Sequence, residues 1–246
     1  MDAIKVAAST YLNSAPLIYG FAKGSLRSRC HLLGDAAPAK CADMLGNRLV
    51  DVALIPSIEY QRLCNVLIVP AISVASKFSV KSVLLFSKVP IEQIQTLALD
   101  LSSRTSATLV RILLEHIYKL KPVYKQQIPN LEQMLECSDA ALIIGDPAMV
   151  AASDSKHQYY IYDMAKEWRE MTSLPFVFAL WAVTADLPRE RRNKVVDYCT
   201  ISKAEGLSAR SQIAQDYSNQ LQLPLESLQS YLLENISYEL DEENLA

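Results

Sequence analysis

Short apolar runs typical of β-strands alternate with helical segments along two separate parts of this chain. In the first part the strand-like runs are residues 4–9, 29–35 and 52–55. In the second part, which begins at Thr96, they are residues 97–99, 123–128 and 140–144. Each of these runs is followed by a segment with helical character. Such alternation is typical of a parallel sheet covered by helices.

Two strand-like runs, residues 71–75 and 80–86, follow one another closely and interrupt the alternation. They separate the two βα series, so we expect two lobes with a hinge and a ligand cleft between them. The predicted crossings between the lobes lie at about residues 85–95 and 174–180. The predicted α/β fold therefore has a discontinuous first lobe, residues 1–88 and 178–246, and a second lobe, residues 89–177.

Composition and charge exclude several classes of protein. A chain of 246 residues that is 50% hydrophobic can bury a large core. Its net charge is −3 and it has no basic stripe, so we expect no nucleic-acid partner. No apolar stretch is long enough to span a membrane, and a strand-like run from Ile4 leaves no room for a signal peptide.

The cysteines indicate the cellular compartment in which we expect the protein. The five cysteines are scattered and form no C-x-x-C pair, which predicts reduced thiols in a cytoplasmic protein rather than disulfides or a zinc site. We expect no metal and no cofactor.

A polar turn, residues 101–106, lies where a predicted strand ends and a predicted helix begins. Free backbone N–H groups and the helix dipole favour an anion at such a helix start. Four hydroxyl side chains surround Arg104 in this turn, which is more than one helix cap needs. Two alternatives stay open: Ser102 or Ser103 is an ordinary N-cap, and Arg104 either binds a ligand or points away from the cleft.

Six segments, in order along the chain, resemble the chorismate dehydratase family of the futalosine route to menaquinone. They are residues 11–17 with 19–20, 51–60, 82–87, 103–106, 143–148 and 174–181. The resemblance implies a fold like the type II periplasmic binding proteins, and dehydration of chorismate to 3-[(1-carboxyvinyl)oxy]benzoate. One departure is visible: the family has a glycine between Ser76 and Val80, where this chain has Lys77-Phe78-Ser79.

A substrate with two carboxylates needs two anion receptors. Ser103, Thr105, Ser106 and their amides are candidates for one carboxylate, with Arg104 beside them. Ser57 and the loop from Ser76 to Ser82 are candidates for the other. The remaining candidates for substrate contact are Tyr11, Gly145, Asp146 and Phe176. For the last two, the alternatives are a helix-start acid at Asp146 and a core aromatic at Phe176.

Asn13 occupies the catalytic position that the family motif implies. An amide is too weakly basic to be a general base, whose pKa should lie near the working pH. We therefore expect Asn13 to orient the substrate, whose own carboxylate takes the proton. The alternative is a helix cap ahead of Pro16.

Three other functions remain open or are disfavoured. The fold also suits a non-catalytic binding protein for a small carboxylate. A naphthoate-forming synthase of the same pathway would need a histidine base, and no histidine lies in a predicted cleft loop. The effector domain of a transcription regulator would need a DNA-binding segment that this chain lacks.

Overall fold

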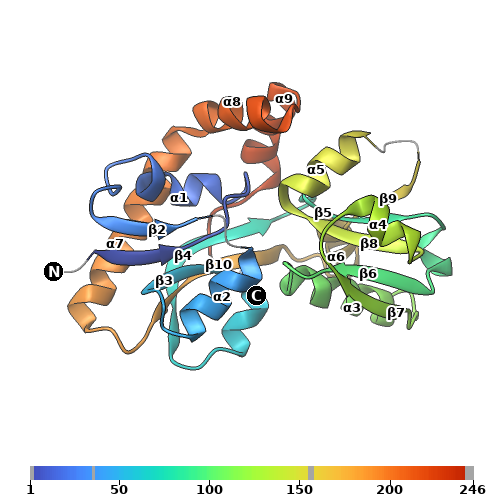
Figure 1. Cartoon of the computed structure of the whole chain (residues 1–246), viewed down its shortest axis with the longest axis horizontal. Helices are drawn as coiled ribbons and strands as arrows, with labels where there is room; N and C mark the ends of the chain where they lie inside the picture. Colours follow the sequence, from blue (N-terminus) through green and yellow to red (C-terminus); the bar gives the residue numbers. More distant parts are fainter. Residues whose placement is uncertain (1–2, 35–36, 155–157, 242–246) are drawn as a thin grey trace.

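The computed structural model describes residues 3–34, 37–154 and 158–241, which form two five-stranded sheets. Figure 1 shows the sheets as the centres of two lobes that lie next to each other. The predicted two-lobed α/β fold is confirmed.

The first sheet pairs three parallel strands with two strands from later in the chain. Its spatial order is β2 (Cys30–Leu33), β1 (Ile4–Ala7), β3 (Val52–Pro56), β10 (Phe176–Thr184) and β4 (Val66–Ser76). Alternate residues point to opposite faces of a strand. Val6 therefore packs with α1 (Ala15–Ala22) and α7 (Arg189–Ser208), whereas Ala7 packs with α2 (Pro38–Gly46).

The second sheet is built in the same way. Its order is β7 (Val123–Gln127), β6 (Thr96–Asp100), β8 (Ala140–Ile144), β5 (Val83–Ser87) and β9 (Tyr160–Asp163). One face packs with α3 (Thr105–His116) and α6 (Met164–Thr172), and the other with α4 (Leu131–Glu136) and α5 (Gly145–Asp154). Both sheets are thus covered on both sides.

The chain changes sheets earlier than the sequence indicates. β5 is antiparallel to β8 and β9, so it belongs to the second sheet. The boundary predicted between residues 88 and 89 lies after β5, whereas the chain crosses before it. The chain returns to the first sheet at β10, which pairs with β3 and β4.

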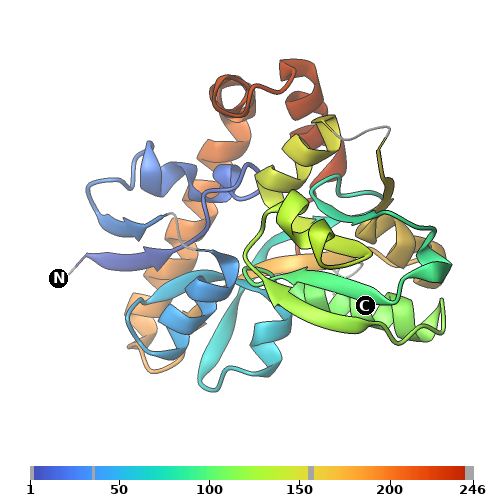
Figure 2. The same cartoon turned by 45° about the vertical axis from the view of Figure 1, so that its right-hand side comes forward.

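The C-terminal part is helical and ends beside the junction of the lobes. Figures 1 and 2 show α8 (Arg210–Leu221) and α9 (Leu225–Ser230) over this junction. A π-helical turn, η3 (Tyr231–Asn235), follows, and Ser237 then forms an antiparallel bridge with Ala75 of β4. Two short 3-10 turns, η1 (Ser57–Gln61) and η2 (Ile91–Gln93), complete the elements.

All five cysteines are free thiols. Within the described ranges, no helix combines the length and the apolar character needed to cross a membrane. The same ranges hold no group of three or more His, Cys, Asp or Glu side chains placed to share a metal ion.

Candidate functional site

A cleft lies between the two lobes and encloses about 520 Å³ of empty space, including its open mouth. Its lining contains seven of the residues that the sequence predicts for the site: Tyr11, Asn13, Ser103, Arg104, Thr105, Ser106 and Gly145. The other lining residues are Ser9, Ser14, Pro38, Leu54, Pro56, Val74, Val83, Ile144, Phe178 and Ala179. Both sheets therefore contribute to one hollow.

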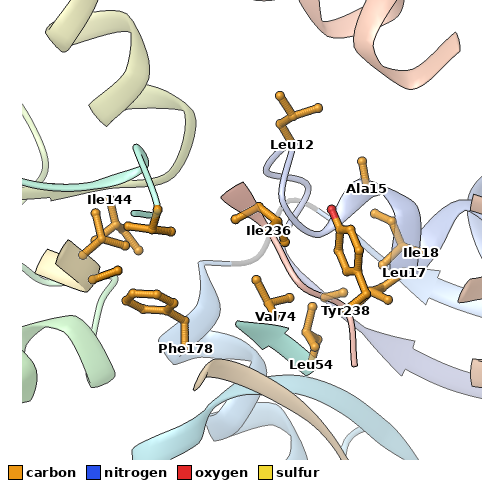
Figure 3. Packing of buried hydrophobic residues seen from close by; sticks show 14 of the residues in the cluster. Leu12, Ala15, Leu17, Ile18, Leu54, Val74, Ile144, Phe178, Ile236 and Tyr238 are labelled. Carbon is orange, nitrogen blue, oxygen red and sulfur yellow. The ribbon is translucent and has the colours of Figure 1, made fainter. Parts of the chain in front are cut away.

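One wall of the cleft is apolar. Figure 3 shows Ile144 and Phe178 close together, with Val74 and Leu54 further along the same hollow. These side chains are nearly fully buried. The polar lining residues lie before and at the starts of α1 and α3 instead.

The polar turn at the start of α3 contains no side-chain cap. Its N-cap position is Arg104. Ser102 is occupied elsewhere, because its N–H and Oγ both donate to Asp100 Oδ1, at 2.8 and 2.6 Å. The hydroxyls of Ser103 and Ser106 are buried in the cleft lining. The N-terminal amides of α3 are therefore left to the cleft, which is the arrangement that favours an anion.

Arg104 joins the two lobes. Its Nη1 donates to Glu59 Oε2 at 2.9 Å, and its Nη2 donates to both Asp43 oxygens at 2.8 and 3.0 Å. Asp43 and Glu59 belong to the first lobe, on α2 and η1. The guanidinium is thus neither a free ligand-binding group nor a surface group that points away: it lines the cleft and forms an interlobe ion pair.

Thr105 and Ser57 form a second interlobe contact. Their hydroxyl oxygens are 3.3 Å apart, and Thr105 Oγ1 also accepts a hydrogen bond from the Ile58 N–H at 3.2 Å. Ser57 Oγ donates to the carbonyl of Val177 at 2.7 Å. Ser57 does not line the cleft, because its hydroxyl holds β10 and α3 against η1. Its predicted role as a second carboxylate receptor is not supported by this geometry.

Asn13 lies in the loop between β1 and α1, two residues before Ala15, the first residue of the helix. Ser14 Oγ donates to Asn13 Oδ1 at 3.2 Å, and Ser9 Oγ lies 3.1 Å from Ser14 Oγ. No side chain caps α1, so the alternative of a helix cap at Asn13 does not hold. The amide is part of the cleft lining.

Tyr11 crosses from the first lobe to the second. Gly145 has φ +68°, and a Cβ added there would lie 2.6 to 2.8 Å from the Tyr11 ring. Glycine is therefore required both by the backbone and by the close approach of the ring. Burial, with Asp100 nearby, raises the pKa of the Tyr11 phenol, so this wall of the cleft stays neutral.

Asp146 lies behind this wall rather than on the cleft lining. Its Oδ1 accepts a hydrogen bond from the Leu12 N–H at 2.9 Å, across the lobes. Burial raises the pKa of Asp146 to about 6, although the hydrogen bond from Leu12 opposes this rise. In this structure Asp146 thus forms an interlobe contact and is not part of the cleft lining.

Three further predicted residues do not line the cleft. Ser82 is fully buried and accepts a hydrogen bond from Tyr231. Ser76 is also buried, and its Oγ has no partner among the described residues. Phe176 packs on Trp168 instead, with ring centroids 5.3 Å apart.

Sequence reasoning missed some of the lining. Phe178 lines the cleft, whereas the predicted contact residue Phe176 packs on Trp168, and the register shift of β10 between Val177 and Ala179 could not be predicted from its apolar run. Ser9 and Ser14 were also missed, although they flank Asn13 and lie on the same loop. Their spacing from Asn13 is the signal that could have found them.

The sequence profile of a menaquinone biosynthesis family matches residues 4–246. The chain belongs to this menaquinone biosynthesis family. A chorismate dehydratase from Thermus thermophilus is 30% identical to it over 247 aligned residues, which cover 94% of this chain and 88% of the relative. The expected family is therefore confirmed.

Solved structures show the same fold for this family member. Protein AF1704 from Archaeoglobus fulgidus aligns with a TM-score of 0.75 at 16% identity, covering 98% of this chain and 92% of that one. A Candida albicans protein described as having the generic periplasmic binding protein fold aligns with a TM-score of 0.67 at 12% identity, covering 97% and 82%. At these identities the likeness shows the fold alone, and it confirms the periplasmic-binding-protein-like architecture.

Proposed function

We propose that this protein removes water from chorismate to give 3-[(1-carboxyvinyl)oxy]benzoate, in the cytoplasm. The Thermus thermophilus relative that supports this proposal is named for chorismate dehydration. The cleft geometry supports it as well, because an apolar wall for a ring lies next to a helix start suited to a carboxylate.

The observation that carries the proposal is the chemistry of the cleft lining. Among the described residues, the lining contains no carboxylate side chain and no histidine; its titratable groups are Tyr11 and Arg104. A reaction that needs a strong protein base does not suit such a site. Loss of water from chorismate creates an aromatic ring, so the reaction is driven by the product and needs mainly orientation and exclusion of water.

Binding rests on the first turn of α3. Holding a ligand at micromolar affinity takes about 8 kcal/mol. A helix dipole contributes only about 0.3–1 kcal/mol, whereas each hydrogen bond to a charged group contributes about 1.5–3 kcal/mol. The hydroxyls of Ser103 and Ser106, with the uncapped amides of α3, supply several such bonds to one carboxylate. Arg104 adds little net charge, because Asp43 and Glu59 neutralise it.

Asn13 holds the other side of the ring. Its amide orients the substrate so that a substrate carboxylate takes the ring proton. The electrons of the broken C–H bond form the new ring double bond as the neighbouring C–O bond breaks. The proton and the hydroxide leave as water, and atoms and charge balance without any cofactor.

The test is direct incubation of the pure protein with chorismate, with the aromatic product followed by chromatography and mass spectrometry. We expect turnover by the wild type and a loss of at least about 100-fold in kcat for Asn13→Ala, the low end of the effect of one positioned polar group. Asn219→Ala, on the exposed face of α8, is the matched control and should keep full activity. Normal turnover by Asn13→Ala would show that the assignment of Asn13 is wrong.

Two other functions are outcomes of the same assay. Binding of chorismate without product would indicate a non-catalytic binding protein. A naphthoate-forming synthase with a histidine base is disfavoured, because His31 on β2 and His116 at the end of α3 are exposed and absent from the lining. His157 lies outside the described residues.

A further inference from the structure

The hydroxyls of Ser57 and Thr105 belong to a hydrogen-bond chain that crosses between the lobes beside the cleft. The Ile58 N–H donates to Thr105 Oγ1 at 3.2 Å, and Ser57 Oγ donates to the Val177 carbonyl at 2.7 Å. The two hydroxyl oxygens are 3.3 Å apart. Because Ser57 gives its one hydroxyl hydrogen to Val177, Thr105 is the donor between the two hydroxyls. The chain therefore runs in one direction, from the Ile58 amide to the Val177 carbonyl.

The Val177 carbonyl lies at an irregularity of β10. The pairing of β10 with β3 begins at Ala179, opposite Pro56, which is the last residue of β3. On the other side of β10, the register with β4 shifts between Val177 and Ala179, as it does at a β-bulge. Where β3 has ended, the hydroxyl of Ser57 thus takes the place of a neighbouring strand as the partner of this carbonyl.

Phe178, the residue at the bulge, lines the cleft. Its ring is held from behind by other aromatic rings. Its centroid lies 4.8 Å from that of Phe176, and the Phe176 centroid lies 5.3 Å from that of Trp168 on α6. Figure 3 shows the Phe178 ring beside Ile144 of the second lobe. The stack fixes the ring, and the Ser57 hydroxyl fixes the peptide that precedes it.

The other end of the same chain lies at the anion-binding turn. Thr105 is the first residue of α3, and its neighbours Ser103 and Ser106 are the candidates for holding a carboxylate. Through Ser57, this turn is connected to the residue directly before Phe178. A single serine side chain thus links the polar turn of the second lobe to the apolar wall of the cleft.

We propose that Ser57 is a positioning residue, which sets the spacing between the α3 turn and the Phe178 ring and so selects a ligand whose carboxylate and ring fit both. This inference rests on the proposed function for its kinetic part. Ser57 does not line the cleft, so it acts through Thr105 and the Val177 peptide rather than on the substrate.

Ser57→Ala removes the hydroxyl and adds no atoms, and the bond from the Ile58 N–H to Thr105 stays in place. We expect KM for chorismate to rise about tenfold, which corresponds to about 1.4 kcal/mol. We expect kcat to change less than about threefold, because the loss affects how the substrate is held and not the reacting atoms. A wild-type KM in Ser57→Ala would overturn the proposal.

Ser87→Ala is the matched control. Its hydroxyl also donates to a carbonyl at 2.7 Å, that of Val89. Ser87 ends β5, whereas the cleft-lining residue of this strand is Val83, at its other end. The variant loses the same kind of bond away from the cleft, so it should keep the wild-type KM.

A double-mutant cycle tests whether Ser57 acts through the apolar wall. Phe178→Leu keeps an apolar side chain but removes the ring. If Ser57 acts by placing this ring, adding Ser57→Ala to Phe178→Leu should raise KM less than Ser57→Ala does in the wild type. Fully additive effects would show that the two side chains act independently, and would overturn the link.

A readout independent of turnover makes the proposal testable even if the protein does not dehydrate chorismate. The chain has five phenylalanines, so the ring signals of Phe178 can be identified in protein with ¹³C-labelled phenylalanine as those that disappear in Phe178→Leu. We expect them to shift in Ser57→Ala and to stay in place in Ser87→Ala. A wild type without product but with this shift would refute the dehydratase function alone. Unshifted signals in Ser57→Ala would overturn the positioning role.

Discussion

The ion pairs of Arg104 are predicted to keep the cleft closed, and Arg104→Gln removes them while keeping most of the side-chain length. The arm to Asp43 is exposed, with 54% of the Asp43 side chain accessible, so it contributes about 0–1 kcal/mol. In the arm to Glu59 the side chains are 31% and 5% exposed, and a hydrogen bond between charged groups there contributes about 1.5–3 kcal/mol. Glu59 keeps its contact with Arg62 at 3.1 Å, so the variant does not leave it unpaired. For the two ion pairs together we take about 2 kcal/mol. Their loss should lower the ratio of closed to open molecules about 30-fold.

Hydrogen exchange measures this ratio at amides that cross the junction. The N–H groups of Ile58 and Leu12 donate to Thr105 and Asp146 of the other lobe, so they exchange only when the lobes separate. We expect both to exchange about 30-fold faster in Arg104→Gln, as the 2 kcal/mol implies.

Arg62→Gln is the matched control for this experiment. Arg62 pairs with the same Glu59, but within one lobe and with its side chain 57% exposed, so its loss should leave both amides unchanged. Equal exchange rates in Arg104→Gln and Arg62→Gln would refute the reasoning.

Two further substitutions test the junction behind the cleft. The raised pKa of Asp146 means that the unfolded chain releases this proton first, so the contribution of Asp146 to the free energy of unfolding should fall as the pH rises from about 4 to about 6 and then level off. Asp146→Asn should remove this fall and raise the free energy of unfolding at pH 7 by at most about 3 kcal/mol, seen in urea titrations across this pH range; an unchanged pH profile would contradict it. Gly145→Ala should cost at least about 1–2 kcal/mol, since alanine at φ +68° is strained and its Cβ meets the Tyr11 ring. Gly46→Ala, whose added Cβ meets only the flexible end of Leu63, is its control, and equal urea midpoints for the two variants would contradict the argument.

Local patterns predicted the strands, the helix starts and the polar turn, because each depends on neighbouring residues. Strand pairing depends on residues that are far apart in the sequence. The apolar run of β5 carries no mark of its partners, so its place in the second sheet could not be read from residues 83–87 alone. The same limit applies to hydroxyl groups. Ser57 follows a strand and Ser82 precedes one, as ligand-binding residues do. In the structure, however, the Ser57 hydroxyl bonds to the carbonyl of Val177 and the Ser82 hydroxyl bonds to Tyr231.

The C-terminal segment was the least predictable contribution. Nothing in the sequence around Tyr231 resembles a motif, and its helical pattern predicts only packing. The end of η3 lies beside β4 and the loop before β5, and this placement depends on contacts with residues far away in the sequence, so only the fold could reveal it.

The contacts that close the lobes and the groups that line the cleft belong to the same turns. Thr105 bonds to the first lobe and also lines the cleft, next to the buried lining residue Ser106. Gly145 forms the wall, whereas the next residue, Asp146, holds Leu12. A shift of either turn therefore alters closure and ligand contacts together. It follows that closure and binding are coupled, so Arg104→Gln should raise KM for chorismate even though most of its charge is neutralised by Asp43 and Glu59.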